Sequence, residues 1–582
     1  MRGLHGARLT RGRARLVPLG LLATAALTFL APARALAATR PAERARHAMV
    51  VAAEPLAAAE GLKVLREGGN AVDAAVTTAF TLAVTWPQAG NIGGGGFILI
   101  RPAGGEPLFI DFREVAPAAA TRDMFLDDKG EPIPDASTHT YRAAGVPGTV
   151  AGLAMALRRT GTIPLSRAIA PAIRLAREGF TIGRGLEEKL LDETARLSRY
   201  PTSRALFFRG DRPLQAGERL VQEDLARTLE EIARDGPDAF YRGRIARALA
   251  KDMKEHDGLV TREDLEKYQP LERTPLEGRY RGHRILSAPP SSSGGVALVQ
   301  ILNMLEPFDL RAMGHNSSEY IHTASEAMKR AFADRAQWLG DPAFVDVPVR
   351  ALIAHDYARN MMRSFDPRRA TPAAVAGPGE PRREGASTTH LSVIDASGMA
   401  VSLTVTLNDS FGCGAVATGL GFLLNDEMDD FSMKPGTPNV YGLIGGTANA
   451  IAPGKRMLSS MTPTIVTAGD GSAERPWLII GSPGGPSIIS AVAQTIVNVL
   501  DFGMELQAAV DAPRFHHQWI PDRIQVDRGV FPRDVLDALT ARGHDVEERM
   551  PAGNVQAILI DGEPGWILGA PDARGYGAAL GY

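Results

Sequence analysis

Hydrophobic and polar positions repeat with two different periods along this chain. The apolar spacing between 54 and 69 predicts a helix that ends at Gly68-Gly69. Charged and apolar positions also repeat at helical spacing through much of 150–270. Further helices are expected at 71–84, from about 295 and at 317–338, and short apolar runs predict strands at 97–100 and 284–287. The pattern therefore indicates a protein of mixed helices and strands.

A strict period of two appears between Thr388 and Asn408. The odd positions from 399 to 407 are apolar, and the even positions from 400 to 408 are small or polar. A three-residue turn at 396–398 would place Gly398 at positive φ, which pairs Thr388 with Thr406 on the polar face of a hairpin. The alternative is a half-exposed edge hairpin whose threonines reflect β-propensity alone.

The segment before this hairpin has the composition of a linker. Residues 366–387 hold four prolines, four arginines and three glycines, and Val375 is their only branched apolar side chain. Such a stretch cannot bury a core of its own, so 367–387 is expected to be a flexible, exposed linker.

A glycine run at Gly93–Gly96 precedes the strand expected at 97–100. It does not fit a phosphate-binding loop, because such a loop follows a strand and is completed by Lys-Ser/Thr or by the spacing G-x-G-x-x-G. Close packing of the backbone is the better interpretation.

Composition and charge exclude several classes of protein. The 582 residues are 45% hydrophobic and 22% charged, as in ordinary globular proteins. One cysteine, Cys413, rules out an internal disulfide and any multi-cysteine metal site. Of the 64 Lys and Arg residues, six fall within 1–37, which leaves 58 against 66 acidic residues. A mildly acidic body is not expected to bind nucleic acid.

The N-terminus has the pattern of an export signal. A basic stretch ends at Arg15, an apolar run follows from Val17 to Ala31, and Ala35-Leu36-Ala37 offers a cleavage site. The alternative is a membrane anchor, but this run is shorter than the roughly 20 residues that span a bilayer. We expect a signal peptide at 1–37 and an exported protein, periplasmic or secreted, with no membrane segment in its mature form.

Short motifs in order along the chain resemble one enzyme family. They are Gly93–Phe97, Asp111-Phe112-Arg113-Glu114, Gly145–Gly148, Pro289–Gly295, Thr388-Thr389-His390, Leu407-Asn408, Met428–Phe431, Pro438–Gly442, Leu458–Met461, Gly481–Gly485 and Ala512–His517. From about residue 45 to Tyr582 the sequence resembles the γ-glutamyltransferase (γ-glutamyl transpeptidase) family of N-terminal-nucleophile hydrolases.

The resemblance implies a fold and a maturation step. The fold is α/β, a four-layer αββα sandwich. The precursor would cut itself between Ser387 and Thr388, giving a large subunit of 38–387 and a small subunit of 388–582 that form a heterodimer.

The residues suit the chemistry that the family performs. Cleavage would give Thr388 a free α-amino group with a pKa near 8, which can serve as the base for its own hydroxyl. By resemblance, Thr406 orients this nucleophile, and Gly484 and Gly485 form the oxyanion hole. A turn of two glycines lets backbone N–H groups approach a ligand closely.

The substrate pocket follows from the two charges of a γ-glutamyl group. By resemblance, Arg113 binds its α-carboxylate, with a planar fork matched to that group. Asp430, with Glu427 and Asn408, would bind the α-ammonium. The carboxylate would also accept hydrogen bonds from Ser459 and Ser460, and Tyr441 would lie in a lid over the pocket.

The resemblance implies γ-glutamyl transfer and hydrolysis on glutathione and related amides, with water, an amino acid or a dipeptide as acceptor. No cofactor is implied, and we expect no metal site, since His516-His517 lack a ligand pattern. One alternative is a glutaryl or cephalosporin acylase of the same superfamily, against which Asp430 argues. Another is a catalytically silent binding protein with the same fold.

Overall fold

The computed structural model describes residues 40–377, 388–434, 443, 445–549, 553–562 and 565–582. The expected signal peptide (1–37), the cleavage residue Ser387 and the lid residue Tyr441 lie outside the described residues. Contacts divide the chain into 1–39 and one compact unit, 40–582. The following description concerns that second unit alone.

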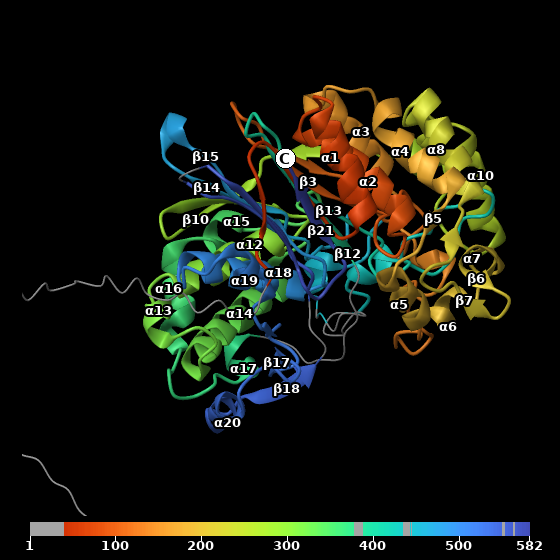
Figure 1. Ribbon diagram of the computed structural model, residues 1–582. Helices are drawn as coiled ribbons and strands as arrows, with labels where there is room; N and C mark the ends of the chain where they lie inside the picture. Colours follow the sequence, from red (N-terminus) through yellow and green to blue (C-terminus); the bar gives the residue numbers. More distant parts are fainter. Residues whose placement is uncertain (1–39, 378–387, 435–442, 444, 550–552, 563–564) are drawn as a thin grey trace, which may run out of the picture. The chain divides into compact units, whose positions relative to one another are not determined.

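Two antiparallel sheets of seven strands form the centre of the unit (Figure 1). The first has the order β21 (Ala578–Gly581), β2 (Met49–Ala52), β12 (Thr388–Ile394), β13 (Ala400–Thr406), β3 (Gly95–Arg101), β4 (Leu108–Asp111) and β9 (Leu271–Arg273). The second has the order β1 (Glu43–Ala45), β20 (Ile567–Pro571), β19 (Gln556–Ile560), β15 (Arg475–Gly481), β14 (Thr464–Ala468), β11 (His283–Ser287) and β10 (Leu276–Tyr280).

Helices cover the outer face of each sheet (Figure 1). The first sheet packs on α1 (Pro55–Arg66), α2 (Ala71–Thr85) and α3 (Thr149–Thr160), with α4 (Leu165–Glu178), α8 (Glu223–Asp235) and α10 (Arg244–Glu255) beyond them. The second packs on α12 (Gly294–Leu305), α14 (Ser318–Trp338), α18 (Ser487–Leu500) and α19 (Leu506–Asp511). The expected four-layer αββα sandwich is confirmed, as are the helices predicted at 54–69, 71–84 and 317–338.

A smaller sheet and short elements complete the unit. They are β16 (Phe515–His516), β17 (Arg523–Asp527) and β18 (Asp545–Arg549) with α20 (Arg533–Ala541), the pairs β5 (Phe180–Thr181) with β8 (Arg219–Leu220) and β6 (Phe208–Arg209) with β7 (Arg212–Pro213), and the helices α5 (Arg184–Asp192), α6 (Thr194–Leu197), α7 (Pro201–Phe207), α9 (Asp238–Tyr241), α11 (Arg262–Lys267), α13 (Leu310–Met313), α15 (Val349–Leu352), α16 (His355–Met361) and α17 (Ala373–Ala376).

The hairpin predicted from residue 388 is β12 and β13. Thr388 pairs with Thr406 in the expected register, and Gly398 in the turn has φ +86°. The hairpin lies at the centre of the first sheet, and both of its strands are buried throughout. The alternative of a half-exposed edge hairpin is therefore wrong.

The two faces of this hairpin pack against different layers. Leu391 and Leu403 join the apolar core on the helical side. On the other face, the Ser392 hydroxyl donates to the carbonyl of Gln556 and the Ser402 hydroxyl donates to that of Ile480, both in the second sheet. The polar face is thus satisfied by the neighbouring sheet instead of by water.

The glycine run packs against backbone, as predicted. A Cβ on Gly94 would lie 2.0 Å from the Thr406 carbonyl oxygen, and one on Gly96 would lie 2.2 Å from that of Thr404. Gly95 and Gly96 already belong to β3, so the strand begins earlier than expected. These glycines let β3 and the end of β13 approach each other closely.

The first half of the expected linker is held against the body, which corrects the prediction that all of 367–387 is exposed and flexible. Thr371 donates its N–H to Glu326 and accepts a hydrogen bond from Lys329 on its carbonyl. Ala373 is buried, and its N–H donates to Asp522 at 2.6 Å. Backbone groups make these contacts, so a composition poor in apolar side chains does not reveal them. Residues 378–387 lie outside the described residues.

None of the helices in the described part of the chain has the length and apolar character needed to cross a membrane.

Candidate active site

The hairpin register brings two threonine hydroxyls together at one end of the first sheet. Thr388 begins β12, Thr406 ends β13, and their Oγ1 atoms are 3.3 Å apart. The N–H of Asn408 donates to Thr406 Oγ1 at 2.8 Å. Thr406 Oγ1 therefore accepts from the backbone while it lies within hydrogen-bond distance of the Thr388 hydroxyl. Thr388 is 7% exposed, so the pair is almost closed off from solvent.

A cavity surrounds these hydroxyls and contains most of the residues predicted for the site. Its lining consists of Arg113, Thr388, Thr406, Asn408, Glu427, Asp430, Ser459, Ser460, Met461, Gly485 and Ile488. Nine of these eleven were singled out from the sequence. They come from strands β12 and β13, the loop after β4, the segment after β13, the loop before β14, the turn before α18 and the start of α18.

Arg113 lies in this cavity as the centre of a buried ion-pair cluster. Its guanidinium pairs with the carboxylates of Glu427 and Asp430, and Glu114 lies 3.7 Å away. Burial alone would lower the pKa of Arg113, but Glu427, Asp430 and Glu114 outweigh it and raise that pKa. Burial raises the pKa of Glu114 to about 7, and that of Glu427 also lies well above its ordinary value. The groups expected to bind the two charges of the substrate are here in contact with each other.

Ser459 and Ser460 are fixed by a serine-rich loop at the start of α12. Ser459 donates its N–H to the Ser291 carbonyl at 3.0 Å, and its own carbonyl accepts from the Ser293 N–H at 2.8 Å. Pro289–Gly295 resembles a family motif, but its sequence indicates no role for it. The structure gives it one, since this loop holds the backbone of Ser459, one of the two serines of the cavity.

Arg335 was missed by sequence analysis. It lies near the end of α14, and its Nη2 donates to Ser460 Oγ at 3.3 Å. In the sequence it belongs to a helix that carries charged residues at many positions, so no local signal distinguishes it from a solvated arginine.

Gly484 and Gly485 form the expected turn between β15 and α18. Their φ angles of +133° and +53° are backbone conformations that residues with a Cβ rarely adopt. A Cβ on Gly484 would also lie 3.1 Å from backbone atoms of Gly553. Both conformation and packing therefore require glycine at position 484, next to the cavity.

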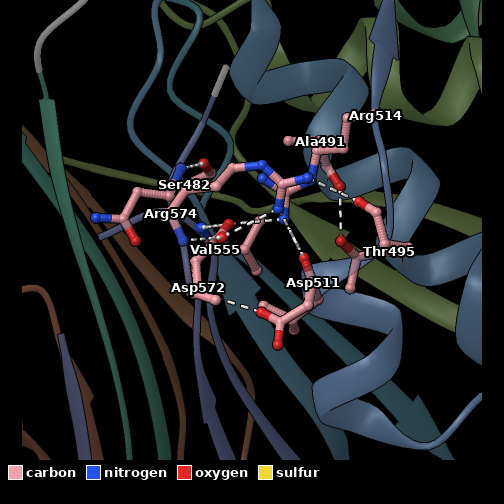
Figure 2. Close-up of polar contacts among 12 residues, drawn as sticks. Ser482, Ala491, Thr495, Asp511, Arg514, Val555, Asp572 and Arg574 are labelled. Carbon is pink, nitrogen blue, oxygen red and sulfur yellow. Dashed lines mark hydrogen bonds and ion pairs between the residues drawn. The ribbon is translucent and has the colours of Figure 1, made fainter. Parts of the chain in front are cut away.

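A buried ion-pair network, shown in Figure 2, holds the segment that packs against this turn. Arg514 Nη2 lies 2.7 Å from Asp572 Oδ2, and Arg574 Nη1 lies 3.1 Å from Asp572 Oδ1. Asp572 Oδ2 also accepts the Val555 N–H. The neighbouring Asn554 N–H donates to the hydroxyl of Ser482, two residues before Gly484. The network thus fixes residues 553–555, on which the glycine turn rests.

His390 is buried beneath the site but cannot serve as its base. It follows the nucleophile by two residues, and its Nδ1 lies 2.8 Å from Thr404 Oγ1. Burial lowers its pKa to about 3, so the ring is a weak base that holds no proton at physiological pH. The ring fills the space beside Gly481, where a Cβ would meet it at 2.3 Å.

Among the residues that the structure describes, one group of side chains has donor atoms suited to a metal ion, namely His322, Glu326 and His544. His322 Nδ1 and His544 Nε2 are 2.7 Å apart, which is hydrogen-bond geometry. Glu326 is already paired with Lys329 and Arg330. Two adjacent cations make this carboxylate a poor ligand for a third. His516 and His517, set aside from the sequence, bind Ser490 and Asp522 respectively.

Comparison with known proteins agrees with this geometry. A family model described as gamma-glutamyltranspeptidase matches residues 57–582. The glutathione hydrolase proenzyme of Escherichia coli (strain K12) is 49% identical over 533 residues, which cover 91% of each chain. The crystal structure of a cephalosporin acylase from Bacillus halodurans is similar, with a TM-score of 0.82 and 28% identity over 96% of this chain and 99% of its own. That of Helicobacter pylori γ-glutamyltranspeptidase is 48% identical over 56% of this chain and 94% of its own, with a TM-score of 0.55. The chain belongs to the γ-glutamyltranspeptidase family.

Proposed function

We propose that this protein is a γ-glutamyltransferase and glutathione hydrolase whose nucleophile is the hydroxyl of Thr388. The observation that carries the proposal is the contact between Thr388 and Thr406 in a cavity that also holds Arg113, Asp430 and the Ser459-Ser460 pair. A nucleophile, its orienting hydroxyl and groups of both charges meet in one place. The family membership and the E. coli relative support the same reaction.

Maturation comes first in the proposed sequence of events. The Thr388 hydroxyl attacks the carbonyl of Ser387, the peptide is converted into an ester, and water releases a large subunit (38–387) and a small subunit (388–582). Strands β12 and β13 of the small subunit lie between β2 and β3 of the large one. The two fragments therefore remain one heterodimer after the cut.

Catalysis then uses the new N-terminus. The α-amino group of Thr388 accepts the hydroxyl proton, and the oxygen attacks the γ-carbonyl of glutathione. The N–H groups at the Gly484-Gly485 turn stabilise the oxyanion. Cysteinylglycine leaves with the proton, and the γ-glutamyl ester passes to water, an amino acid or a dipeptide.

Recognition of the γ-glutamyl group requires a rearrangement of charge partners. Its α-carboxylate takes the place of a carboxylate on Arg113 and accepts from Ser459 and Ser460, while its α-ammonium pairs with Asp430 and Glu427. The substrate thereby supplies both charges that these residues otherwise supply to one another. Desolvated ion pairs of this kind favour the zwitterionic acyl group over a neutral one.

A cephalosporin or glutaryl acylase is the second candidate, because the Bacillus halodurans acylase has the same fold. A glutaryl group brings no α-ammonium. It would leave Asp430 and Glu427 without the partner that the first candidate provides, so the transferase is preferred.

The experiment has two parts, intact mass and activity. Purified protein should consist of a 195-residue fragment beginning at Thr388 and a larger partner, and it should release the amine from a γ-glutamyl anilide, faster with glycylglycine present. Thr388→Ala should remain a single chain. A small fragment beginning at residue 388 in that variant would assign the cut to another protease, and turnover of glutaryl but not γ-glutamyl anilide would favour the acylase.

The last part of the proposal concerns export, which depends on residues 1–37. Their pattern supports removal of a signal peptide near Ala37 and export of the enzyme to the periplasm or the medium.

A further inference from the structure

Arg335 is a buried cation next to the cavity, and the proposed mechanism does not use it. Its side chain comes from α14, and the residue is 3% exposed. Nε donates to Ser293 Oγ at 2.9 Å, and Nη2 donates to Ser460 Oγ at 3.3 Å. It therefore holds both the serine that lines the pocket and the loop behind it.

The charge of Arg335 is not neutralised by a direct partner. Within the described part of the chain, no carboxylate lies within 4.0 Å of it, whereas Arg113 pairs with two and Arg514 pairs with Asp572. Burial lowers its pKa to about 10, with Asp430 raising it and Arg113 lowering it further. It is still charged at neutral pH. An unpaired buried cation is costly, so its presence beside a binding pocket calls for an anion that arrives from outside.

The hydrogen bonds around Arg335 direct this charge toward the cavity. Ser460 Oγ accepts from Arg335, and Ser459 Oγ accepts from the Met461 N–H. Neither hydroxyl donates to another residue that the structure describes, so both protons remain available. A hydroxyl whose oxygen accepts from a guanidinium is a stronger donor, because successive hydrogen bonds polarise one another. Ser460 therefore transmits the charge of Arg335 to whatever anion it binds.

We infer that Arg335 is a specificity-determining positioning residue, which acts through Ser460 to select acyl groups that carry a carboxylate. Arg113 cannot do this alone, because Glu427 and Asp430 already occupy its guanidinium. This inference rests on the proposed function, since it concerns the same pocket. It extends that function by assigning the selection of the carboxylate to a second cation.

Three anilide substrates separate the contributions of the two charges. The γ-glutamyl group has a carboxylate and an ammonium, the glutaryl group has only the carboxylate, and the 4-aminobutanoyl group has only the ammonium. The variants are Arg335→Gln, which removes the charge, and Arg335→Lys, which retains it. Arg101→Gln is the matched control, because Arg101 is a buried arginine like Arg335 but does not line the cavity. Its guanidinium donates to the backbone carbonyls of Gly105 and Glu474.

Arg335→Gln should lower kcat/KM for the γ-glutamyl and glutaryl substrates by about tenfold or more, which is the loss of one charge-assisted interaction. The 4-aminobutanoyl substrate should change by less than about twofold, and Arg335→Lys should recover part of the loss. Where hydrolysis of the 4-aminobutanoyl anilide is slow, its inhibition constant against the γ-glutamyl anilide gives the same comparison. Ratios within one preparation do not depend on the fraction of folded enzyme. Arg101→Gln should leave all ratios unchanged.

Equal losses on all three substrates in the cleaved Arg335→Gln enzyme would overturn the inference and leave Arg335 a structural role only. So would a Lys variant as impaired on the carboxylate substrates as the Gln variant. Failure of the wild-type enzyme on the γ-glutamyl anilide would instead refute the proposed function, so the two failures are distinguishable.

Discussion

The contact between Thr388 and Thr406 gives the sharpest prediction. Thr406→Val removes the hydroxyl and keeps the shape of the side chain. It takes away the hydroxyl 3.3 Å from the nucleophile, which is also the acceptor for the Asn408 N–H. Because the same Thr388 oxygen attacks in maturation and in turnover, both reactions should slow together.

The size of this effect follows from the hydrogen bonds that are lost. Loss of a buried hydrogen-bond partner costs about 1–3 kcal/mol, which corresponds to a factor of about 5 to 150 in rate if the interaction is made in the transition state. Loss of the acceptor for the Asn408 N–H also lowers stability by a similar amount, so thermal unfolding must be followed separately. Thr406→Ser retains the hydroxyl and loses only a methyl group, so it should cleave and turn over at close to the wild-type rate.

Two measurements test this reasoning. Intact mass at successive times gives the rate of self-cleavage, and release of a γ-glutamyl anilide gives kcat for the cleaved fraction. Wild-type rates in both assays for Thr406→Val would show that the 3.3 Å contact is not functional. A Thr406→Ser variant as slow as Thr406→Val would attribute the effect to packing of the methyl group instead of the hydroxyl.

Three further predictions concern charge. Asp430→Asn should reduce γ-glutamyl turnover by at least about thirtyfold and spare a glutaryl substrate, because only the former brings an ammonium; equal losses would remove Asp430 from recognition. Asp522→Asn weakens the bond to the Ala373 N–H, so self-cleavage should slow by about fivefold or more. The kcat of the cleaved enzyme should stay unchanged. A kcat that falls in parallel would show that Asp522 does not act in the precursor alone. The low pKa of His390, about 3, means that the unfolded chain takes up a proton near pH 6.5 and the folded chain does not, so stability falls as the pH drops below 6.5. Between pH 7 and pH 5 this histidine should lower the free energy of unfolding by about 2 kcal/mol. In a cleavage-deficient precursor, His390→Gln should therefore lose less of its free energy of unfolding over this range, as measured by chemical denaturation. The same pH dependence with and without His390 would refute this.

Much of the fold could be predicted from local pattern. The register of β12 and β13 followed from strict alternation and one glycine in the turn, since a slip by one residue would move every polar side chain to the other face. What the pattern could not give is the second sheet that covers this polar face. Ser402 and Ser392 bind carbonyls more than 70 residues away, so the same alternation fits both an exposed edge and a buried centre.

The candidate site divides in the same way. Arg113, Asp430 and the glycine turn lie in motifs short enough to be found by resemblance, and the structure brings them to one cavity. Their mutual pairing was not foreseen, because charges assigned one by one to a substrate are also the strongest available partners for each other. Arg335 was not foreseen at all, because its significance depends on what surrounds it in space.

The segment before the cleavage site shows why composition is a limited guide to order. Val375 is 67% exposed, and no large apolar side chain anchors residues 367–377. The segment is held instead by carboxylates and an ammonium on the body that bind its backbone, from Thr371 to Ala373. Burial alone would raise the pKa of Asp522, but bonds from His517 and Lys329 hold it below its ordinary value, so this anchor stays ionised. Backbone groups are the same in every sequence, and binding through them leaves almost no mark on composition. Order in this segment is therefore encoded in Glu326, Lys329 and Asp522, which lie outside it.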